Sequence, residues 1–203
     1  MIELLLPKRC AGCGAPGQSL CDACRVVLSH PPQRIFTPVD PLVPVWAFAP
    51  YSGVHRQVVL GMKERGRRDV PRLLGAVVLA GLEYLAAQGE IPDLESVELV
   101  PAPTRRCSAR LRGGDPVTLV AQASGCAVCC CVEHAETVAD SVGLDASARR
   151  RNLAGGVVLR RKPTRQVVIV DDVVTTGATI SATVSTLLAA NVQVVGAIAL
   201  AHA

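Results

Sequence analysis

The sequence predicts an α/β protein in which helices flank a parallel sheet and a small cysteine-containing module precedes it. Beyond about residue 40, strand-like apolar runs alternate with helix-like segments, as expected for a parallel sheet. An apolar run at 166–170 ends in two aspartates and a Thr/Gly turn, which is typical of a strand covered on both faces. Near the N-terminus, four cysteines fall in two closely spaced pairs. These three observations predict the fold class.

Composition favours a globular protein with an anionic small ligand. The chain has 203 residues, enough for one domain and a small appendage, and half of them are apolar. The formal charge is +4, with arginines in short groups between acidic and apolar stretches. Proteins that read nucleic acids usually show a stronger basic stripe or an aromatic platform, and only five residues are aromatic here. Direct DNA binding therefore has no support from composition.

We expect a cytoplasmic protein without a membrane span. Met1–Leu6 is apolar apart from Glu3 but lacks a basic leader, and Pro7-Lys8-Arg9 follows too early for a signal peptide. The segment at 73–87 contains Glu83 and falls short of the roughly 20 residues that a span needs. Cytoplasmic cysteines stay reduced, and clustered ones more often bind metal than form disulfides.

The N-terminal cysteines have the spacing of a structural zinc site. The ligand set would be Cys10, Cys13, Cys21 and Cys24, two Cys-x2-Cys pairs of the kind that tetrahedral zinc favours. Nearby glycines permit the tight turns of a knuckle. Unligated reduced cysteines or a redox pair are the alternatives. Four protein ligands would leave no open catalytic position, so zinc would act as scaffolding.

A proline-rich linker follows this module. Six prolines lie between residues 31 and 50, which forbids a long helix and leads into a strand at 43–51. We therefore place a boundary near residue 40, with a zinc-binding module and linker at 1–40 and the main domain at 41–203.

The remaining elements are expected in an alternating order. They are helices at 54–64 and 70–87, a strand at 96–101, a helix after Asp115-Pro116, strands at 126–132 and 166–170, a helix at 178–190 and a strand at 192–201. The last three form a β-loop-α-β unit, whose crossover should be right-handed. Four cysteines lie in the apolar run at 126–132, where buried small side chains are favoured over a second metal site. They are Cys126, Cys129, Cys130 and Cys131.

The turn after 166–170 carries the candidate catalytic residues, Asp171 and Asp172. Ligands of open α/β sheets bind beyond the carboxyl ends of the strands, where these aspartates lie. Successive strand side chains point to opposite faces, so the two carboxylates should have different roles. The segment 175–179 then enters a helix and offers amide N–H groups, hydroxyls and a positive dipole end to an anion. Any one of these residues would suit an ordinary helix start, but the ordered set is harder to explain that way. A Walker P-loop is absent.

Val170–Thr179 resembles, position by position, the phosphoribosyl pyrophosphate motif of type I phosphoribosyltransferases. The resemblance implies that Asp171 and Asp172 hold the ribose hydroxyls. It also implies a loop that wraps the 5-phosphate, formed by Val173, Val174, Thr175, Thr176, Gly177, Ala178 and Thr179. Mg²⁺ would accompany the departing pyrophosphate.

Paired cysteine knuckles before such a motif resemble the competence-associated ComF family. Agreement extends to Tyr51–Val54, Met62–Gly66, Val100–Pro103 and Arg149–Asn152. The resemblance supplies Ala102 and Pro103 as pyrophosphate candidates. The cations Lys63, Arg105 and Arg106 are further candidates, the arginines because they follow a strand end, although a solvated charged loop is the alternative for any one arginine. The chain departs from the family at 112–116, where it reads Arg-Gly-Gly-Asp-Pro instead of Arg-Gly-Phe-Asn-Gln.

Two functions remain open at this point. One is phosphoribosyl transfer to an unknown acceptor. The other is a non-catalytic role on the same fold, as a sensor of phosphoribosyl pyrophosphate or a nucleotide, or as an accessory to DNA-uptake proteins, which the resemblance implies as partners. The sequence leaves the oligomeric state open.

Overall fold

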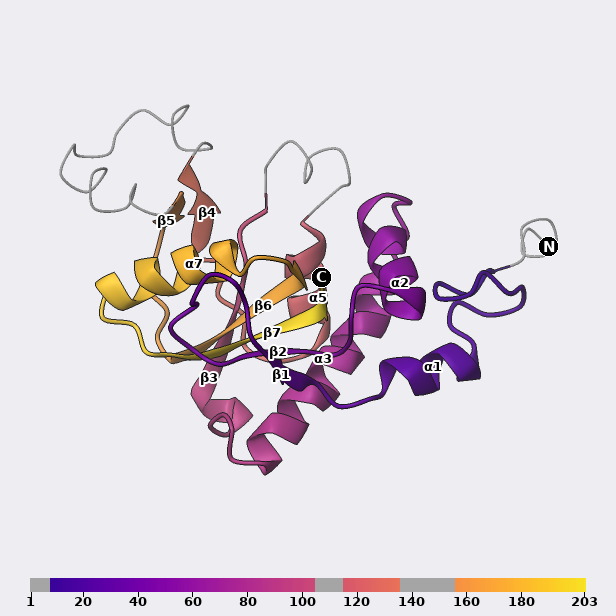
Figure 1. Cartoon of the computed structure of the whole chain (residues 1–203), viewed down its shortest axis with the longest axis horizontal. Coiled ribbons are helices and arrows are strands. Elements are labelled where there is room, and N and C mark those ends of the chain that lie inside the picture. The colour runs from indigo at the N-terminus through magenta and orange to yellow at the C-terminus, as the bar shows by residue number, and fades with distance from the viewer. Residues whose placement is uncertain (1–7, 105–114, 136–155) are drawn as a thin grey trace.

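The chain folds as a mostly parallel sheet flanked by helices, as the sequence predicts (Figure 1). This computed structural model describes residues 8–104, 115–135 and 156–203. The strands are β1 (Gln33–Ile35), β2 (Val45–Ala47), β3 (Val97–Pro101), β4 (Val132–His134), β5 (Val157–Leu159), β6 (Gln166–Val174) and β7 (Val194–His202). The helices are α1 (Asp22–Leu28), α2 (Gly53–Lys63), α3 (Val70–Ala87), α5 (Pro116–Ala123) and α7 (Ala178–Ala189), with a 3₁₀ turn, η2, at Leu94–Ser96.

The main sheet has the strand order β1-β2-β7-β6-β3. β2, β7, β6 and β3 run parallel, whereas β1 pairs antiparallel with β2. β4 and β5 form a separate antiparallel pair. Because the parallel strands share one direction, the ends of β3, β6 and β7 meet at one edge of the sheet. Among the described candidates, Ala102, Pro103, Asp171 and Asp172 lie at that edge.

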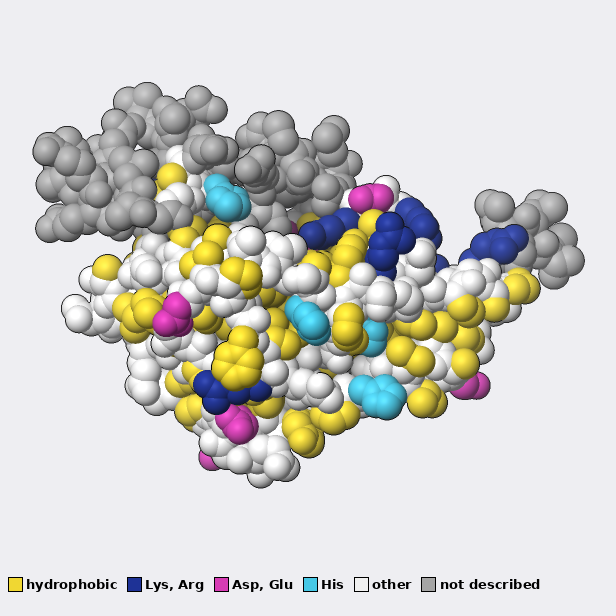
Figure 2. All heavy atoms as spheres, viewed as in Figure 1, with side chains coloured by type: hydrophobic (Ala, Val, Ile, Leu, Met, Phe, Trp, Pro, Cys, Tyr) yellow, Lys and Arg dark blue, Asp and Glu magenta, His cyan; other side chains and the backbone are white. Residues whose placement is uncertain are grey.

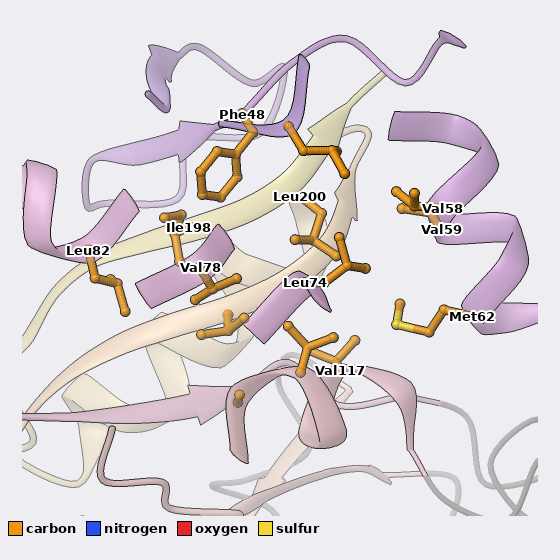
Figure 3. Close-up of a cluster of buried hydrophobic side chains, with 14 of the residues drawn as sticks. Phe48, Val58, Val59, Met62, Leu74, Val78, Leu82, Val117, Ile198 and Leu200 are labelled. Atoms are coloured by element: carbon orange, nitrogen blue, oxygen red, sulfur yellow. The ribbon is translucent and has the colours of Figure 1, made fainter. Parts of the chain in front are cut away.

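The sheet has a buried core on each face. Val168 and Val170 of β6 belong to the cluster formed with α2, α3 and α5, part of which is shown in Figure 3. Val167 and Ile169 belong to the opposite cluster, formed with α7. This alternation follows from the two-residue period of a strand. The apolar run of β6 is continuous because helices cover both of its faces.

α3 is an apolar core helix. It is long and apolar enough to cross a membrane by length and composition, and 44% of that window is buried. It packs against α5 so closely that a Cβ on Gly75 would lie 2.5 Å from the carbonyl carbon of Ala123. A Cβ on Gly81 would lie 2.5 Å from the ring of Phe48. The apolar residues of α3 are therefore explained by its packing in the protein core.

The strand expected at 126–132 is wrong for most of its length. Leu99 N–H donates to Ala127 O at 2.8 Å and Cys129 N–H donates to Leu99 O at 2.9 Å, which gives a single bridge to β3. Cys131 N–H then donates to Cys129 O at 2.9 Å, and this tight turn takes the chain out of the ladder. The regular strand, β4, begins at Val132. Cys129 and Cys131 are buried, as expected, whereas Cys130 is exposed and Cys126 is only partly buried, so the expectation of four buried cysteines is wrong for these two.

The N-terminal segment is closely joined to the sheet. β1 precedes the expected boundary near residue 40 and pairs with β2. Cys10, Cys24 and Leu28 belong to the same buried cluster as α2 and α3. The helix α1 was not anticipated from the sequence. The division into 1–40 and 41–203 stays a prediction.

Candidate functional site

The candidate carboxylates lie on β6, which continues through them to Val174. Asp172 N–H donates to Asp171 Oδ1 at 2.8 Å. Val173 N–H donates to Asp172 Oδ1 at 2.7 Å. Each carboxylate is therefore oriented by the amide of the residue that follows it.

Asp172 is buried against α2. Its side chain is 6% exposed, and its Oδ2 lies 2.5 Å from Nζ of Lys63, the last residue of α2. α2 covers the same face of the sheet as Val168 and Val170, so the strand period brings Asp172 to this helix. Lys63 therefore compensates the charge of Asp172.

Asp171 has different neighbours. It lines a hollow of about 30 Å³ with Val173–Ile180, and Asp172 does not line it. Burial, and then the negative charge of Asp172, raise the pKa of Asp171 to about 8, although its own amide partner and Lys63 act in the other direction. With this pKa, Asp171 is largely protonated at neutral pH, so the pair carries about one negative charge, which Lys63 balances. A cation or hydrogen-bond donors at Asp171 would stabilise its ionised form.

The turn after β6 is shaped by Gly177. This residue is the N-cap of α7 and has a left-handed backbone, with φ of 81°. Thr176 Oγ1 accepts from Ala178 N–H at 3.3 Å, and Thr175 and Thr176 are exposed. The first turn of α7 presents amide N–H groups that have no partner within the helix. Such a turn suits a phosphate group.

The linker between β1 and β2 braces this turn. Val39 N–H donates to Thr176 O at 2.9 Å. A Cβ on Gly177 would lie 2.6 Å from Thr37 Oγ1 and 3.0 Å from Val39 O. Gly177 is therefore required both by its backbone angle and by this contact. Nothing in the sequence at 37–39 signals that the linker reaches the turn.

The exit of β3 lies next to β6 at the same edge. Ala102 N–H donates to Val170 O at 2.8 Å, and Ala102 and Pro103 are both buried. Of the pyrophosphate candidates, the structure thus brings Lys63, Ala102 and Pro103 to the edge that carries the aspartates. Arg105 and Arg106 lie outside the described residues.

Cationic side chains gather at the C-terminal end of α2. Figure 2 shows Lys and Arg side chains at the upper end of this helix, where the sequence reads Lys63-Glu64-Arg65-Gly66-Arg67-Arg68. Of these residues, Lys63 lies beside the strand ends, where it pairs with Asp172. Arg67 instead pairs with Asp69, and Arg65 bonds to Gln57.

Two further hollows are present in the described part of the chain. One, of about 210 Å³, is lined by the exit of β3, by Asp115 at the N-cap of α5, by Thr118, and by β4. The other, of about 600 Å³, is largely apolar and lies between α1 and α3. None of the candidate residues lines the second hollow.

The four N-terminal cysteines have the geometry of a metal site. Their Sγ atoms all lie within 4.8 Å of one another. Cys21 Sγ lies 3.6 Å from the Sγ atoms of both Cys10 and Cys13. Tetrahedral zinc with Zn–S bonds of about 2.3 Å would place sulfurs about 3.8 Å apart. The cluster could hold a metal such as zinc.

The electrostatics of the cluster also suit a cation. Burial acts to raise the pKa of Cys10, but the backbone amides of Cys21, Cys13 and Gly12 outweigh it and lower that pKa to about 6. Burial, and then the neighbouring cysteines, raise the pKa of Cys24. The four sulfurs cannot all carry charge at neutral pH without a counter-ion. A divalent cation would allow all four to ionise.

The cysteine module is fastened to α2 and to the loop after it. Arg67 donates to Arg9 O at 2.6 Å and to Ser19 O at 3.5 Å. The same guanidinium pairs with Asp69, with Nε 3.1 Å from Oδ1. A Cβ on Gly12 would lie 2.8 Å from Cγ1 of Val54, so the knuckle packs directly on α2. Sequence spacing gave no sign of these contacts.

Residues 133–203 match the family model described as phosphoribosyl transferase domain. The matched segment includes β5, β6, α7 and β7, and therefore both aspartates and the Gly177 turn. The match supports the type I phosphoribosyltransferase superfamily, in agreement with the resemblance of Val170–Thr179. None of the curated proteins compared with the chain matches it.

Proposed function

We propose that this protein binds phosphoribosyl pyrophosphate with Mg²⁺ at the carboxyl edge of its sheet and transfers the phosphoribosyl group to an acceptor. The observation that carries the proposal is the β6–α7 unit. It joins two carboxylates and a left-handed glycine turn within the segment that matches the phosphoribosyl transferase domain.

The proposed roles follow the chemistry of each group. A carboxylate accepts hydrogen bonds, so Asp171 and Asp172 suit ribose hydroxyls. The segment Val173–Thr179 offers amide N–H groups and hydroxyls to the 5-phosphate. Lys63, Ala102 and Pro103, with Arg105 and Arg106, would contact pyrophosphate.

The reaction needs positioning and charge balance more than a reactive side chain. Departure of pyrophosphate from the anomeric carbon leaves an oxocarbenium-like centre, which the protein assists by orienting both substrates. Mg²⁺ would neutralise the departing pyrophosphate. The raised pKa of Asp171 fits this requirement, because its carboxylate lacks a full counter-charge in the protein alone. No covalent nucleophile is required.

We also propose that zinc occupies Cys10, Cys13, Cys21 and Cys24 as a structural ion. The sulfur spacing and the four-thiolate donor set support this assignment. Together with the phosphoribosyltransferase match, the cysteine knuckles support kinship with the ComF family. DNA-uptake proteins are then candidate partners.

A non-catalytic role on the same fold is the second candidate. The segment at 112–116 departs from the family, and its described end, Asp115-Pro116, serves as the N-cap and first residue of α5. The departure replaces the aromatic and amide residues of the family with Gly, Asp and Pro, which favours a protein that binds phosphoribosyl pyrophosphate as a sensor, or as a competence accessory, without transferring it.

Calorimetric titration of the zinc-loaded protein with phosphoribosyl pyrophosphate, with and without Mg²⁺, tests the shared part of both candidates. Saturable Mg²⁺-dependent binding that is lost in the Asp171→Asn/Asp172→Asn variant is expected. Asp93→Asn, which changes an exposed carboxyl before β3, is the matched control and should bind normally. Unchanged affinity in the double variant would refute the ribose assignment.

An acceptor screen for pyrophosphate release then separates the two candidates. Release with any nucleobase or other nucleophile establishes transfer. Tight binding without release from a broad panel favours the sensor.

A further inference from the structure

One carboxylate joins the chain on the two sides of residues 105–114. Asp115 Oδ1 accepts from Thr104 Oγ1 at 2.9 Å and from Val117 N–H at 3.3 Å. Asp115 Oδ2 accepts from Thr118 Oγ1 at 2.7 Å and from Thr118 N–H at 3.4 Å. Four donors from three residues thus converge on a single side chain.

These donors identify Asp115 as a residue that fixes structure and does not itself bind an anion. Both of its oxygens are occupied, and the N-terminus of α5 stabilises its negative charge. A free carboxylate beside a pyrophosphate group would repel it. The four donors and the helix N-terminus lower the cost of holding the charge of Asp115 beside such a ligand.

α5 gives this carboxylate a rigid support. Val117, Val120 and Ala121 are at most 1% exposed, and the helix packs tightly on α3. A side chain capping such a helix has little freedom to move. Asp115 is therefore held in a fixed position relative to the core, and so is the residue that bonds to its Oδ1.

That partner is the exit of β3. At one end, Ala102 N–H is bound to Val170 O of β6 at 2.8 Å. At the other end, Thr104 is bound to Asp115. The three residues Ala102–Thr104 are therefore held between the sheet and α5, beside the strand that carries Asp171 and Asp172.

We propose that Asp115 is a positioning residue, which through Thr104 holds Ala102–Thr104 in the conformation that binds pyrophosphate. This inference rests on the proposed function, because it concerns the same site. It explains why aspartate and proline stand at 115 and 116: the pair starts α5 and anchors the neighbouring strand exit.

Two nearly isosteric substitutions distinguish an effect on ligand binding from an effect on protein stability. Thr104→Val removes the hydrogen bond to the strand exit and leaves the helix cap intact. Thr118→Val removes one hydrogen bond from the same carboxylate on the helix side and leaves Thr104 bound. We expect similar small losses of thermal stability, and affinity for Mg²⁺-pyrophosphate about tenfold lower in Thr104→Val alone. Equal affinities in the two variants would overturn the inference.

A double-mutant cycle tests whether Thr104 acts through Asp115 or binds the ligand directly. Asp115→Ala should weaken pyrophosphate binding as much as Thr104→Val, and the double variant should be no weaker than Asp115→Ala. Additive losses would show that Thr104 contacts the ligand itself and would overturn positioning. If the unmodified protein binds neither pyrophosphate nor phosphoribosyl pyrophosphate, the proposed function fails, and this role fails with it. Normal binding by the unmodified protein and by Thr104→Val overturns the positioning role alone.

Discussion

Replacing Asp171 with Asn should stabilise the protein at alkaline pH while it weakens ligand binding. The pKa of this carboxyl rises from 3.8 to about 8, mainly through burial and the charge of Asp172. An acid with a raised pKa in the folded state costs stability wherever it is ionised, and costs nothing below its ordinary pKa. The cost therefore grows as the pH rises from about 4 to about 8.

The expected size follows from the same shift. A rise of about four pKa units corresponds to at most about 6 kcal/mol. Because Asp171 keeps some contact with solvent, we expect Asp171→Asn to gain about 2 kcal/mol at pH 8 and almost nothing at pH 4. Urea unfolding of zinc-loaded protein without Mg²⁺, at several pH values, measures this difference.

Asp172→Asn is the matched control and should have the opposite sign. Its carboxylate pairs with Lys63, so its removal leaves a partly buried ammonium without its partner. We expect a loss of about 1–2 kcal/mol at neutral pH. If Asp171→Asn is no more stable than the unmodified protein at pH 8, the reasoning about uncompensated charge at Asp171 is wrong.

Two further predictions concern the supports of the site. Gly177→Ala should cost about 2 kcal/mol in urea unfolding, because its backbone is left-handed and its Cβ would meet Thr37, and phosphoribosyl pyrophosphate affinity should fall at least about tenfold; wild-type affinity would contradict the assigned role of the turn. Removing zinc with a chelator should lower the melting temperature and weaken the same affinity several-fold, because the cysteine module packs on α2, which carries Lys63. Arg67→Ala should also lower the melting temperature and weaken phosphoribosyl pyrophosphate binding, but less than zinc removal does. If neither zinc removal nor Arg67→Ala changes that affinity, the cysteine module and the ligand site are independent.

Local patterns were predictable from the sequence, and long-range contacts were not. The β6–α7 turn and the cysteine pairs involve residues close in the chain, so their spacing already encodes the geometry. The pairing of Lys63 with Asp172 depends on which face of the sheet α2 covers, which periodicity alone does not give. The strand predicted at 126–132 failed because a turn at Cys129–Cys131 keeps those residues buried outside the ladder.

The departure at 112–116 shows a different limit of sequence reasoning. In the sequence, Asp115 and Pro116 stand out only as a departure from the resemblance to the ComF family. In the structure, Asp115 caps α5 and binds Thr104, eleven residues earlier in the chain. A residue that differs from a family pattern can therefore have a role that the pattern does not describe.

The charge of the site favours a sugar phosphate over phosphate alone. A glycine turn at a helix N-terminus would bind any phosphate group, but an ionised Asp171 beside it repels anions. Lys63 offsets the charge of its partner, Asp172. Carboxylates become favourable when the ligand brings hydroxyl donors or a cation, as a ribose diol with Mg²⁺ does. Ribose 5-phosphate should therefore bind more tightly than inorganic phosphate, and Asp171→Asn should narrow that difference; equal affinities in a competition titration would indicate that the aspartates do not face the sugar.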